Sequence, residues 1–516
     1  MKISCGKLPV LMALLWWGMA LSAQTTPGKL DNYAGSSATW LNPSTMRTTF
    51  VYTDFGIASF DMVIHNNFAY LPQHSFLPSL LSLYSEGGTW ATFEGKQPNK
   101  DYYYQYFDPD FEKKRHTNIY ESMNLTLPSF MLTIGGRHAV GFSLRQRVYT
   151  SIVKTPWEIP VLITESLSWK PMQHQRFTSG GMRFANMEWS EANVSYAATL
   201  LEDGAFKLDV GATARLMLGV AGFTGRFESL DYEVLHKDTL YFYGMEGDMN
   251  IVAPVDYSVN FRQDTDHLLQ IRDPFYRGWG FGGDVGLSLT YKKSSMIPLK
   301  PKTACDDYPV NYFWRLGVSL LDVGKVRFDD NTLSGDLRGE EMRVNLKLFD
   351  TVQSVNGLVG LMDTLMGNQT STFVYGTKFG IGLPSAVSVQ FDANVYRDFY
   401  VNATWIHPVS HLLYKDAVER EPLVCVTPRF ENVFFGAALP VTLYNYSYVS
   451  MGAFFRMGPV QLGTNDLLSL AGFTKTRSID FYLAVRLKLS RGDCLFHPFL
   501  DACGDKYIKR SRKREQ

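Results

Sequence analysis

Two patterns in the sequence, one of glycines and one of histidines, have spacings found in functional sites. The glycine spacing occurs in cofactor-binding loops, and the histidine spacing occurs in metal sites. Gly278, Gly280 and Gly283 match the fingerprint of a dinucleotide-binding loop, which needs a helix to open where the phosphates bind. Residues 282–291 instead alternate polar and apolar side chains, as a strand does, and no helix opens there. The pattern therefore predicts glycines on a curved strand, and we expect no cofactor.

His407 and His411 have the i, i+4 spacing of a metal pair on a helix. Pro408 lies between them and no Glu is adjacent, so a solvated turn is expected in place of a zinc site. The chain has 10 His and many Ser, but no Gly-x-Ser-x-Gly elbow, paired-carboxylate signature or metal cluster singles out a catalytic group. We therefore predict no enzyme and no catalytic or metal residue.

The composition indicates what kind of chain could carry these patterns. The 50 basic side chains balance the 50 acidic ones, which argues against a nucleic-acid-binding surface. The sequence also contains 28 Tyr, 35 Phe, 10 Trp and 42 Gly, a mixture typical of a strand-rich chain with an aromatic surface.

The first residues resemble an export signal. Lys2 and Lys7 precede an apolar run over residues 8–21, and Ser22, Ala23 and Gln24 follow where a signal peptidase would cut. The run is shorter than the roughly 20 residues that a membrane-spanning helix needs. We predict a signal peptide over residues 1–24, and the strands described next make the outer membrane the expected destination.

Long segments with a period of two predict the fold. Residues 206–216 place Phe206, Leu208 and Val210 on one face and charged or small residues on the other, and residues 387–395, 399–405 and 481–489 repeat the alternation. Strands of about ten residues are long enough to cross a bilayer when tilted, whereas soluble sheets use shorter ones. We predict an all-β fold: a transmembrane antiparallel barrel of roughly 14 strands over residues 49–490.

The barrel model assigns the charged side chains to the interior. A charge on the lipid face near the midplane costs about 2–4 kcal/mol, so charges within the strands should face the lumen. The residues expected there are Arg145, Arg147, Lys207, Asp209, Arg215, Asp392 and Arg486. Such an interior could conduct a solute, or it could be a network that braces and closes the wall. Both readings stay open.

Three segments depart from the strand pattern. Residues 25–48 form a turn-rich lead-in of small residues, and residues 491–516 form a tail with a basic end. Residues 333–372 contain apolar residues spaced by three, at Leu346, Phe349, Val352 and Val355, which predicts a loop or lumenal helix in place of a strand.

Four cysteines remain after the signal peptide, in an exported chain for which disulfides are permitted. Cys494 and Cys503 are close in sequence and share a turn-rich tail, so we predict that they pair; two free thiols are the alternative. Cys425 follows Leu423 and Val424 and is expected to face lipid.

Several phrases resemble known families. Residues 32–35 (Asn-Tyr-Ala-Gly), followed by Asn42, Pro43 and Ser44, resemble the start of the long-chain fatty-acid transporter superfamily, although Ser44 replaces the usual Ala. Residues 316–324, 382–384, 458–466 and 479–483 resemble an uncharacterised outer-membrane barrel family of Bacteroidetes. That family has no settled activity, so the resemblance implies a fold and a location.

The superfamily resemblance implies that the lead-in tucks into the lumen as a hatch formed around Asn32, Gly35, Asn42 and Pro43; a first strand with an ordinary periplasmic turn is the alternative. It also implies a barrel that binds or transports a hydrophobic small molecule. The alternatives are a structural, assembly or secretion scaffold and, less favoured, an outer-membrane lipid hydrolase. The expected partners are outer-membrane lipid, the small molecule and an envelope or secretion protein.

Overall fold

The computed structural model describes residues 27–70, 116–165, 167, 170–260, 274–293, 310–367 and 373–491. The predicted signal peptide, Cys305, the proposed Cys494–Cys503 pair and the tail after Arg491 lie outside these residues. Within them, no helix has both the length and the apolar character that crossing a membrane requires.

The described strands close into an antiparallel barrel of 14 strands, so the predicted fold and strand number are confirmed. Closure comes from pairing of the first strand with the last, between Val51↔Ser490 and His65↔Ser478. In order around the wall, the strands are β1 (Val51–Asn66), β2 (Thr117–Ile134), β3 (His138–Thr155), β5 (Met182–Asp203), β6 (Phe206–His236), β8 (Gly278–Lys292), β9 (Tyr312–Phe328), β13 (Ala386–Tyr396), β14 (Phe399–Pro408), β15 (Leu423–Glu431), β16 with β17 (Phe435–Ala438, Val441–Tyr444), β18 with β19 (Tyr448–Met451, Ala453–Met457), β20 (Val460–Thr464) and β21 (Ser478–Ser490).

The two faces of the wall have opposite character. On β8, Trp279, Phe281, Val285 and Leu287 are exposed on the outside, whereas Asp284, Ser288 and Thr290 face inward and are buried. Apolar outside and polar inside is the arrangement of a transmembrane barrel, because the outer face meets lipid. From Trp279 to Tyr291 the strand covers about 40 Å at 3.4 Å per residue, or about 30 Å of membrane at the usual tilt.

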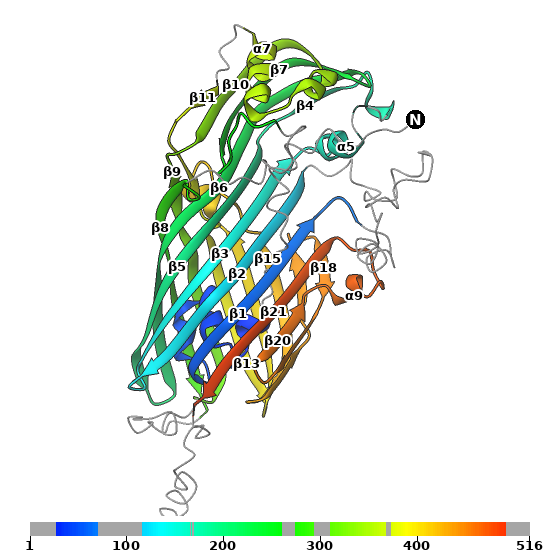
Figure 1. Ribbon diagram of the computed structural model, residues 1–516. Coiled ribbons are helices and arrows are strands. Elements are labelled where there is room, and N and C mark those ends of the chain that lie inside the picture. Colours follow the sequence, from blue (N-terminus) through cyan, green and yellow to red (C-terminus); the bar gives the residue numbers. More distant parts are fainter. Residues whose placement is uncertain are drawn as a thin grey trace, which may run out of the picture.

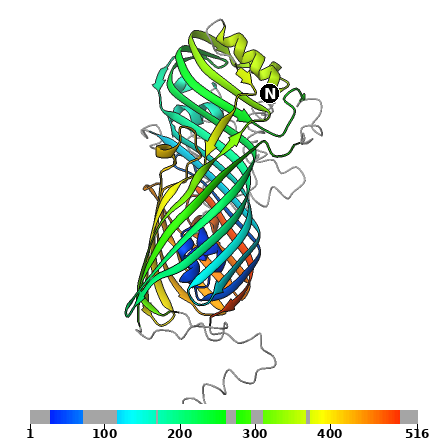
Figure 2. The ribbon, with the colours of Figure 1, turned by 90° about the vertical axis from the view of Figure 1, so that its left-hand side faces the viewer.

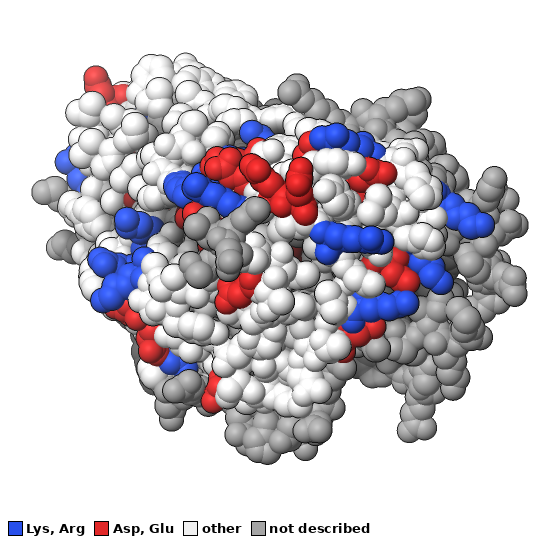
Figure 3. All heavy atoms as spheres, turned by 90° about the horizontal axis from the view of Figure 1, so that it is seen from above, with Lys and Arg blue, Asp and Glu red and all other residues white. Residues whose placement is uncertain are grey.

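The two ends of the barrel differ in their connections. At the lower end in Figure 1, tight turns join neighbouring strands at Gly135–Gly136, Gly204 and Arg397. Most of the long connections, such as those between β1 and β2 and between β3 and β5, lie at the other end, whereas the one between β8 and β9 starts and ends at the lower end. Short turns face the periplasm in outer-membrane barrels, so we call the lower end periplasmic and the upper end outer. Figure 3 shows that both signs of charge lie side by side on the outer end.

Several strands continue beyond the barrel into a second sheet, the cap, at the outer end (Figures 1 and 2). The distal part of β6 pairs with β4 (Arg176–Ser179) and β7 (Thr239–Val252), and β7 pairs with β10 (Thr332–Asn345), which pairs with β11 (Phe373–Tyr375). The helices associated with the cap and the neighbouring connections are α5 (Glu158–Glu165), η6 (Lys170–Met172), η7 (Leu346–Thr351) and α7 (Val355–Met366).

The cap corrects the expectation for residues 333–372. Their first part is the strand β10, and the helical part, η7 and α7, lies in the cap and not in the lumen. The spacing by three reflects the packing of one face of this segment on the cap sheet, where Val355 and Val359 are buried beside Leu333. Nothing in the sequence indicated that strands within residues 49–490 would leave the barrel wall.

The N-terminal residues 27–50, which we call the plug, lie inside the lower half of the barrel, as the dark blue segment in Figure 2 shows. They form three short helices, α2 (Pro27–Leu30), η1 (Gly35–Trp40) and η2 (Pro43–Arg47). Asn42 caps η2 by accepting a hydrogen bond from the Ser44 amide at 3.0 Å, and Pro43 occupies the first helical position. The first-strand alternative for this segment is therefore wrong.

Candidate ligand chamber and its two closures

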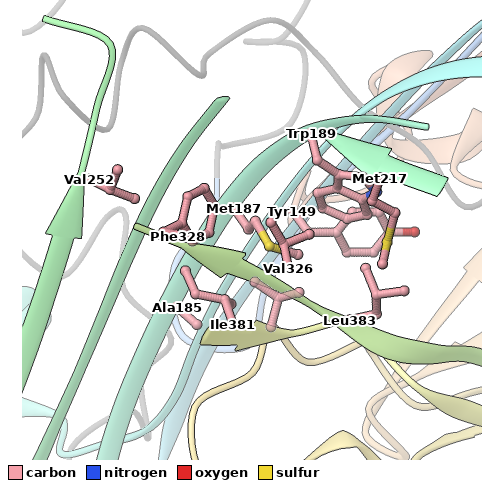
Figure 4. Close-up of a cluster of buried hydrophobic side chains, with 11 residues drawn as sticks. Tyr149, Ala185, Met187, Trp189, Met217, Val252, Val326, Phe328, Ile381 and Leu383 are labelled. Atoms are coloured by element: carbon pink, nitrogen blue, oxygen red, sulfur yellow. The ribbon is translucent and has the colours of Figure 1, made fainter. Parts of the chain in front are cut away.

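The upper part of the lumen contains a cluster of 11 apolar side chains, which we call the chamber (Figure 4). Trp189, Met187 and Met217 are fully buried in it, although they come from strands whose lower halves present polar residues inward. The full set is Tyr149, Ala185, Met187, Trp189, Met217, Val252, Val326, Phe328, Ile381, Leu383 and Val418. Ile381 belongs to β12 (Phe379–Gly382), a short strand paired with the top of β9.

Val418 reaches the chamber from the connection between β14 and β15, residues 409–422, which we call the inner loop. The loop begins with α8 (Ser410–Leu413) and then packs on β12, where the Gly382 amide donates to the Asp416 carbonyl at 2.8 Å and the Val418 amide donates to the Gly382 carbonyl at 3.2 Å. Val418 has no exposed surface. The inner loop therefore covers the chamber from the outer side.

Three consecutive charged residues tie the inner loop to the wall. Glu419 pairs with Arg183 of β5 at 2.7 Å, Arg420 pairs with Asp322 of β9, and Glu421 contacts His65 of β1. The three partners stand on well-separated strands. The loop is therefore held across the lumen and not at one edge.

Asp322 is the centre of a buried arginine cluster below the chamber. Its carboxylate accepts hydrogen bonds from Arg147 at 2.7 and 3.1 Å and also from Arg215 and Arg420. Its backbone has a φ of 53°, a conformation that non-glycine residues seldom adopt, and its amide donates to Asp284 at 2.6 Å. Hydrogen bonds to three arginines and to Asp284 thus hold Asp322 in a strained backbone conformation.

The cluster continues down to the plug. Glu191 lies 2.8 Å from the Arg145 Nε and 3.3 Å from Arg147. The Arg145 guanidinium lies 4.5 Å from the centre of the Trp40 ring, and Lys29 lies 4.4 Å from the same ring. Contacts therefore run without a break from the inner loop, through Asp322 and Glu191, to the plug.

Polar contacts fasten the plug to several strands. Asn32 donates to Tyr312 at 2.9 Å and to Glu431, and Asp31 accepts from Arg456 at 2.7 Å. Asn42 donates to Gln390 at 3.1 Å. Because these partners lie on separate strands, they determine one position for the plug.

Wall glycines make room for the plug. A Cβ atom on Gly211 of β6 would collide with the backbone of Pro43 and Ser44, and one on Gly286 of β8 would collide with the Asn42 side chain. The two glycines are neighbours in the β6–β8 register. They form a flat area on the inner wall, and the start of η2 packs directly against the glycine backbone there.

All seven charged residues that the sequence predicted to face the lumen are buried. In addition to the arginine cluster, Lys207 pairs with Asp209 at 3.0 Å, Asp392 with Arg429 at 2.7 Å, and Arg486 with Asp54. Asn32, Gly35, Asn42 and Pro43 are buried in the plug. These residues form the arginine cluster, the plug and separate ion pairs, not one common site.

The chamber and the inner loop were missed by sequence reasoning. One sequence feature in β5 could have indicated the chamber. Met187 and Trp189 lie on the same inward face as Glu191, so apolar side chains replace polar ones in the upper part of that face. The expectation for Cys425 was wrong: it has no exposed surface and packs inward with Leu423 and Tyr444, its thiol 3.3 Å from the Thr427 hydroxyl. His407 stacks on Trp405 at 5.6 Å, and His411 lies in α8, outside that strand.

Packing leaves little free volume in the described lumen. A cavity between plug and wall, lined by Leu30, Leu41 and Arg315 among others, measures about 40 Å³. Two cavities nearer the outer end measure about 20 and 10 Å³. Such spaces hold a few water molecules but are far below the volume of a drug-sized pocket. None of these three spaces has room for such a ligand.

Several solved structures are similar to this chain at low sequence identity. The Ralstonia pickettii toluene transporter TbuX is 9% identical with a TM-score of 0.39, over 91% of this chain and 99% of that one. The Pseudomonas putida toluene transporter TodX is 8% identical with a TM-score of 0.32, over 90% and 98%. A Pseudomonas aeruginosa FadL homologue is 9% identical with a TM-score of 0.28, over 90% and 96%. These TM-scores are too low to transfer a function.

No curated protein sequence matches the chain. A family model does match, over residues 76–465, which include the strands from β2 to β20 and both the chamber and the inner loop. By this match the chain belongs to DUF5723, a family of unknown function.

Proposed function

We propose that this chain is an outer-membrane barrel that takes up a hydrophobic small molecule from the outside, binding it first in the chamber. The observation that carries the proposal is an apolar cluster at the outer end of the lumen, above the buried arginine cluster, covered on its outer side by a loop and not by the wall. If the inner loop withdraws, Val418 leaves the cluster and an apolar molecule can replace its contacts. Burial of apolar surface then supplies the binding free energy.

The lower lumen has a different role in this proposal. Many of its inward wall residues are charged or polar, and its apolar side chains, such as Met46, Phe50 and Leu41, are already packed between plug and wall. An apolar molecule therefore gains little by entering this half while the plug is in place. The plug closes this half and acts as the hatch. Movement of the plug would break contacts such as Asp31–Arg456 and replace them with contacts to water.

Photolabelling with an apolar diazirine tests the chamber. The full-length protein in detergent is irradiated with the probe, and labelled peptides are identified by mass spectrometry. We expect labels on chamber peptides containing Met187 or Met217. Ala185→Trp fills the chamber and should abolish those labels. Val194→Trp adds the same ring to the same strand at a position that is 61% exposed on the lipid face, and should leave them unchanged.

Labels confined to lipid-facing peptides, in the wild type and in both variants, would contradict the proposal. Both variants must first show the change in migration on boiling that marks an assembled barrel. This control separates a filled chamber from a misfolded one, because overpacking alone costs about 1–3 kcal/mol.

Deletion of residues 32–43 tests the hatch. The deletion removes Asn32 and Asn42, which fasten the plug to β9, β13 and β15, while the strand residues remain. We expect the barrel to assemble and the outer membrane of cells producing it to become more permeable to small solutes. Unchanged permeability with an assembled barrel would show that the plug does not close the path.

A structural or scaffold barrel is the second candidate. The observation that favours it is the small size of the cavities beside the plug and the inner loop, about 10 to 40 Å³. Buried ion pairs that need no ligand could serve only to brace the wall. Unlabelled chamber peptides together with unchanged permeability in the deletion variant would select this candidate. Copurification with an envelope protein at fixed stoichiometry would then indicate a scaffold.

A further inference from the structure

A boundary between lipid and water can be located on the outside of the barrel near its outer end. Trp279 is 53% exposed at the top of β8 and lies opposite Leu218 of β6, which lies opposite Ser190 of β5. Ser190 contacts the Gln146 side chain, so this level carries outward polar groups. Below it the outward residues are apolar, such as Phe281 and Leu216. Aromatic residues at such a transition mark the membrane interface.

Two cations stand at this boundary on the lipid face of β9. Arg327 lies directly opposite Trp279, and Lys325 lies opposite Phe281, one step toward the membrane interior. Both side chains are exposed, and no described carboxylate pairs with either of them. A lysine or arginine facing lipid is costly unless its charge reaches water or an anion.

The side chain of Lys325 points toward Arg327. Its Cδ atom lies 3.7 Å from where a Cβ on Gly380 would stand, and Gly380 of β12 is the partner of Arg327 and not of Lys325. The stem of Lys325 therefore runs outward along a strand that has no side chain to obstruct it.

A third cation lies just above. Lys378 precedes β12, is 57% exposed, and has Asp329 at 4.0 Å, the limit of an ion pair. Three cations thus follow one another on the outward face of β9 and at the start of β12, only Lys378 with a described carboxylate in reach, and two large exposed aromatic rings stand on the adjacent strand β8. Cations at the outer edge with apolar rings below match an amphiphile whose anionic head lies at the interface and whose chains lie in the bilayer.

We propose that Lys325, Arg327 and Lys378 bind the phosphate group of an outer-leaflet lipid, with its acyl chains against Phe281 and Trp279. Lysine and arginine near a membrane surface attract anionic headgroups, and guanidinium groups form paired hydrogen bonds with phosphate. The site is on the outside of the wall and is independent of the chamber. Its occupant is a membrane lipid and not a transported molecule.

Native mass spectrometry of the full-length protein in detergent, with added monophosphoryl lipid A, tests the site. We expect one retained lipid. Lys325→Gln with Arg327→Gln should weaken retention about 25-fold, since each cation near a headgroup contributes roughly a factor of five. The matched control, Lys347→Gln with Arg338→Gln, removes the same charge from exposed cap positions and should retain the lipid as the wild type does.

Two outcomes would overturn the proposal. Equal retention by the wild type and the Lys325–Arg327 variant would show that these cations only extend to water. Displacement of the lipid by an equal concentration of inorganic phosphate would show a site for a free anion and not for a lipid. Heat-dependent migration of both variants, checked first, confirms that each barrel has assembled.

Discussion

The two halves of the lumen are filled in different ways. The lower half holds a plug that is fastened by directional polar contacts, such as Asn42 to Gln390, and that packs on bare glycine backbone. The upper half holds the chamber, where most contacts are between apolar side chains, and Trp189 donates a hydrogen bond down to Glu191 at 2.9 Å. Polar contacts specify one position and can be exchanged for water, whereas apolar packing accepts a substitute of similar shape. The lower half is therefore suited to closing, and the upper half to binding.

Asp322→Ala should have the largest effect, because it lies where the two halves meet. The change leaves Arg147, Arg215 and Arg420 without their shared carboxylate, and removing one partner of a buried ion pair costs about 3–5 kcal/mol. We expect a lower temperature for the shift in electrophoretic migration and faster hydrogen exchange in both inner loop and plug. Asp336→Ala, at an exposed cap position, is the control. Faster exchange in the loop alone would show that the halves are independent.

Met187→Ala tests the packing of the upper half. The side chain is fully buried in the chamber, and such a truncation costs about 2–5 kcal/mol when a cavity remains. Because an apolar cavity stays dry and binds apolar molecules, benzene should restore part of the lost thermal stability. Met457→Ala, 64% exposed on the outer wall, should show neither effect. Absence of rescue by benzene would mean that the chamber collapses and cannot hold a substitute.

Gly211→Val tests the packing of the lower half. The new side chain would occupy the position of the Pro43 and Ser44 backbone, and forcing it in costs about 1–3 kcal/mol. We expect the plug to leave the wall, seen as faster hydrogen exchange in residues 27–50. Gly244→Val adds the same side chain in the cap, where a Cβ would meet nothing within 4 Å, and should leave the plug protected. A protected plug in Gly211→Val would mean that the wall moves to accommodate the change.

Glu158→Gln should have the smallest effect. Glu158 lies at the outer end, beside the cap and beyond the upper half of the lumen. Burial at the start of α5 raises the pKa of the Glu158 carboxyl above its ordinary value. The folded state therefore binds this proton more tightly than the unfolded chain does, so the carboxyl contributes most to the free energy of unfolding at low pH. This contribution declines as the pH rises from the ordinary pKa of a glutamate through the raised pKa of the folded state. The protection of α5 from hydrogen exchange, taken relative to the base-catalysed rate of an unfolded chain at each pH, should fall over that range in the wild type, and not in Glu158→Gln.

The matching control is Glu228→Gln, whose side chain is 56% exposed. It should retain the pH dependence of the wild type. If the dependence survives in Glu158→Gln as well, another group near α5 is responsible.

Local patterns were enough to predict the barrel but not its contents. Alternation in residues 206–216 and 282–291 is a property of single strands, and it predicted β6 and β8. The cap strands alternate in the same way, so the sequence could not separate strands that face lipid from those that do not. Charges such as Arg147 were expected inside because lipid excludes them, but their partners depend on which strands face each other across the lumen. The inner loop has no local period at all.

The plug has a consequence for the order of assembly. Asn32 and Asp31 bind Glu431 and Arg456, which follow them by 399 and 425 residues, so these contacts form only after nearly all the wall strands exist. Closing such long loops is slow, and the growing barrel must hold its inward charges in water until the last strand pairs with the first. Docking of the plug is then a late step, which needs β15 and β19 in place. A barrel caught before it would be wide, hydrated and permeable.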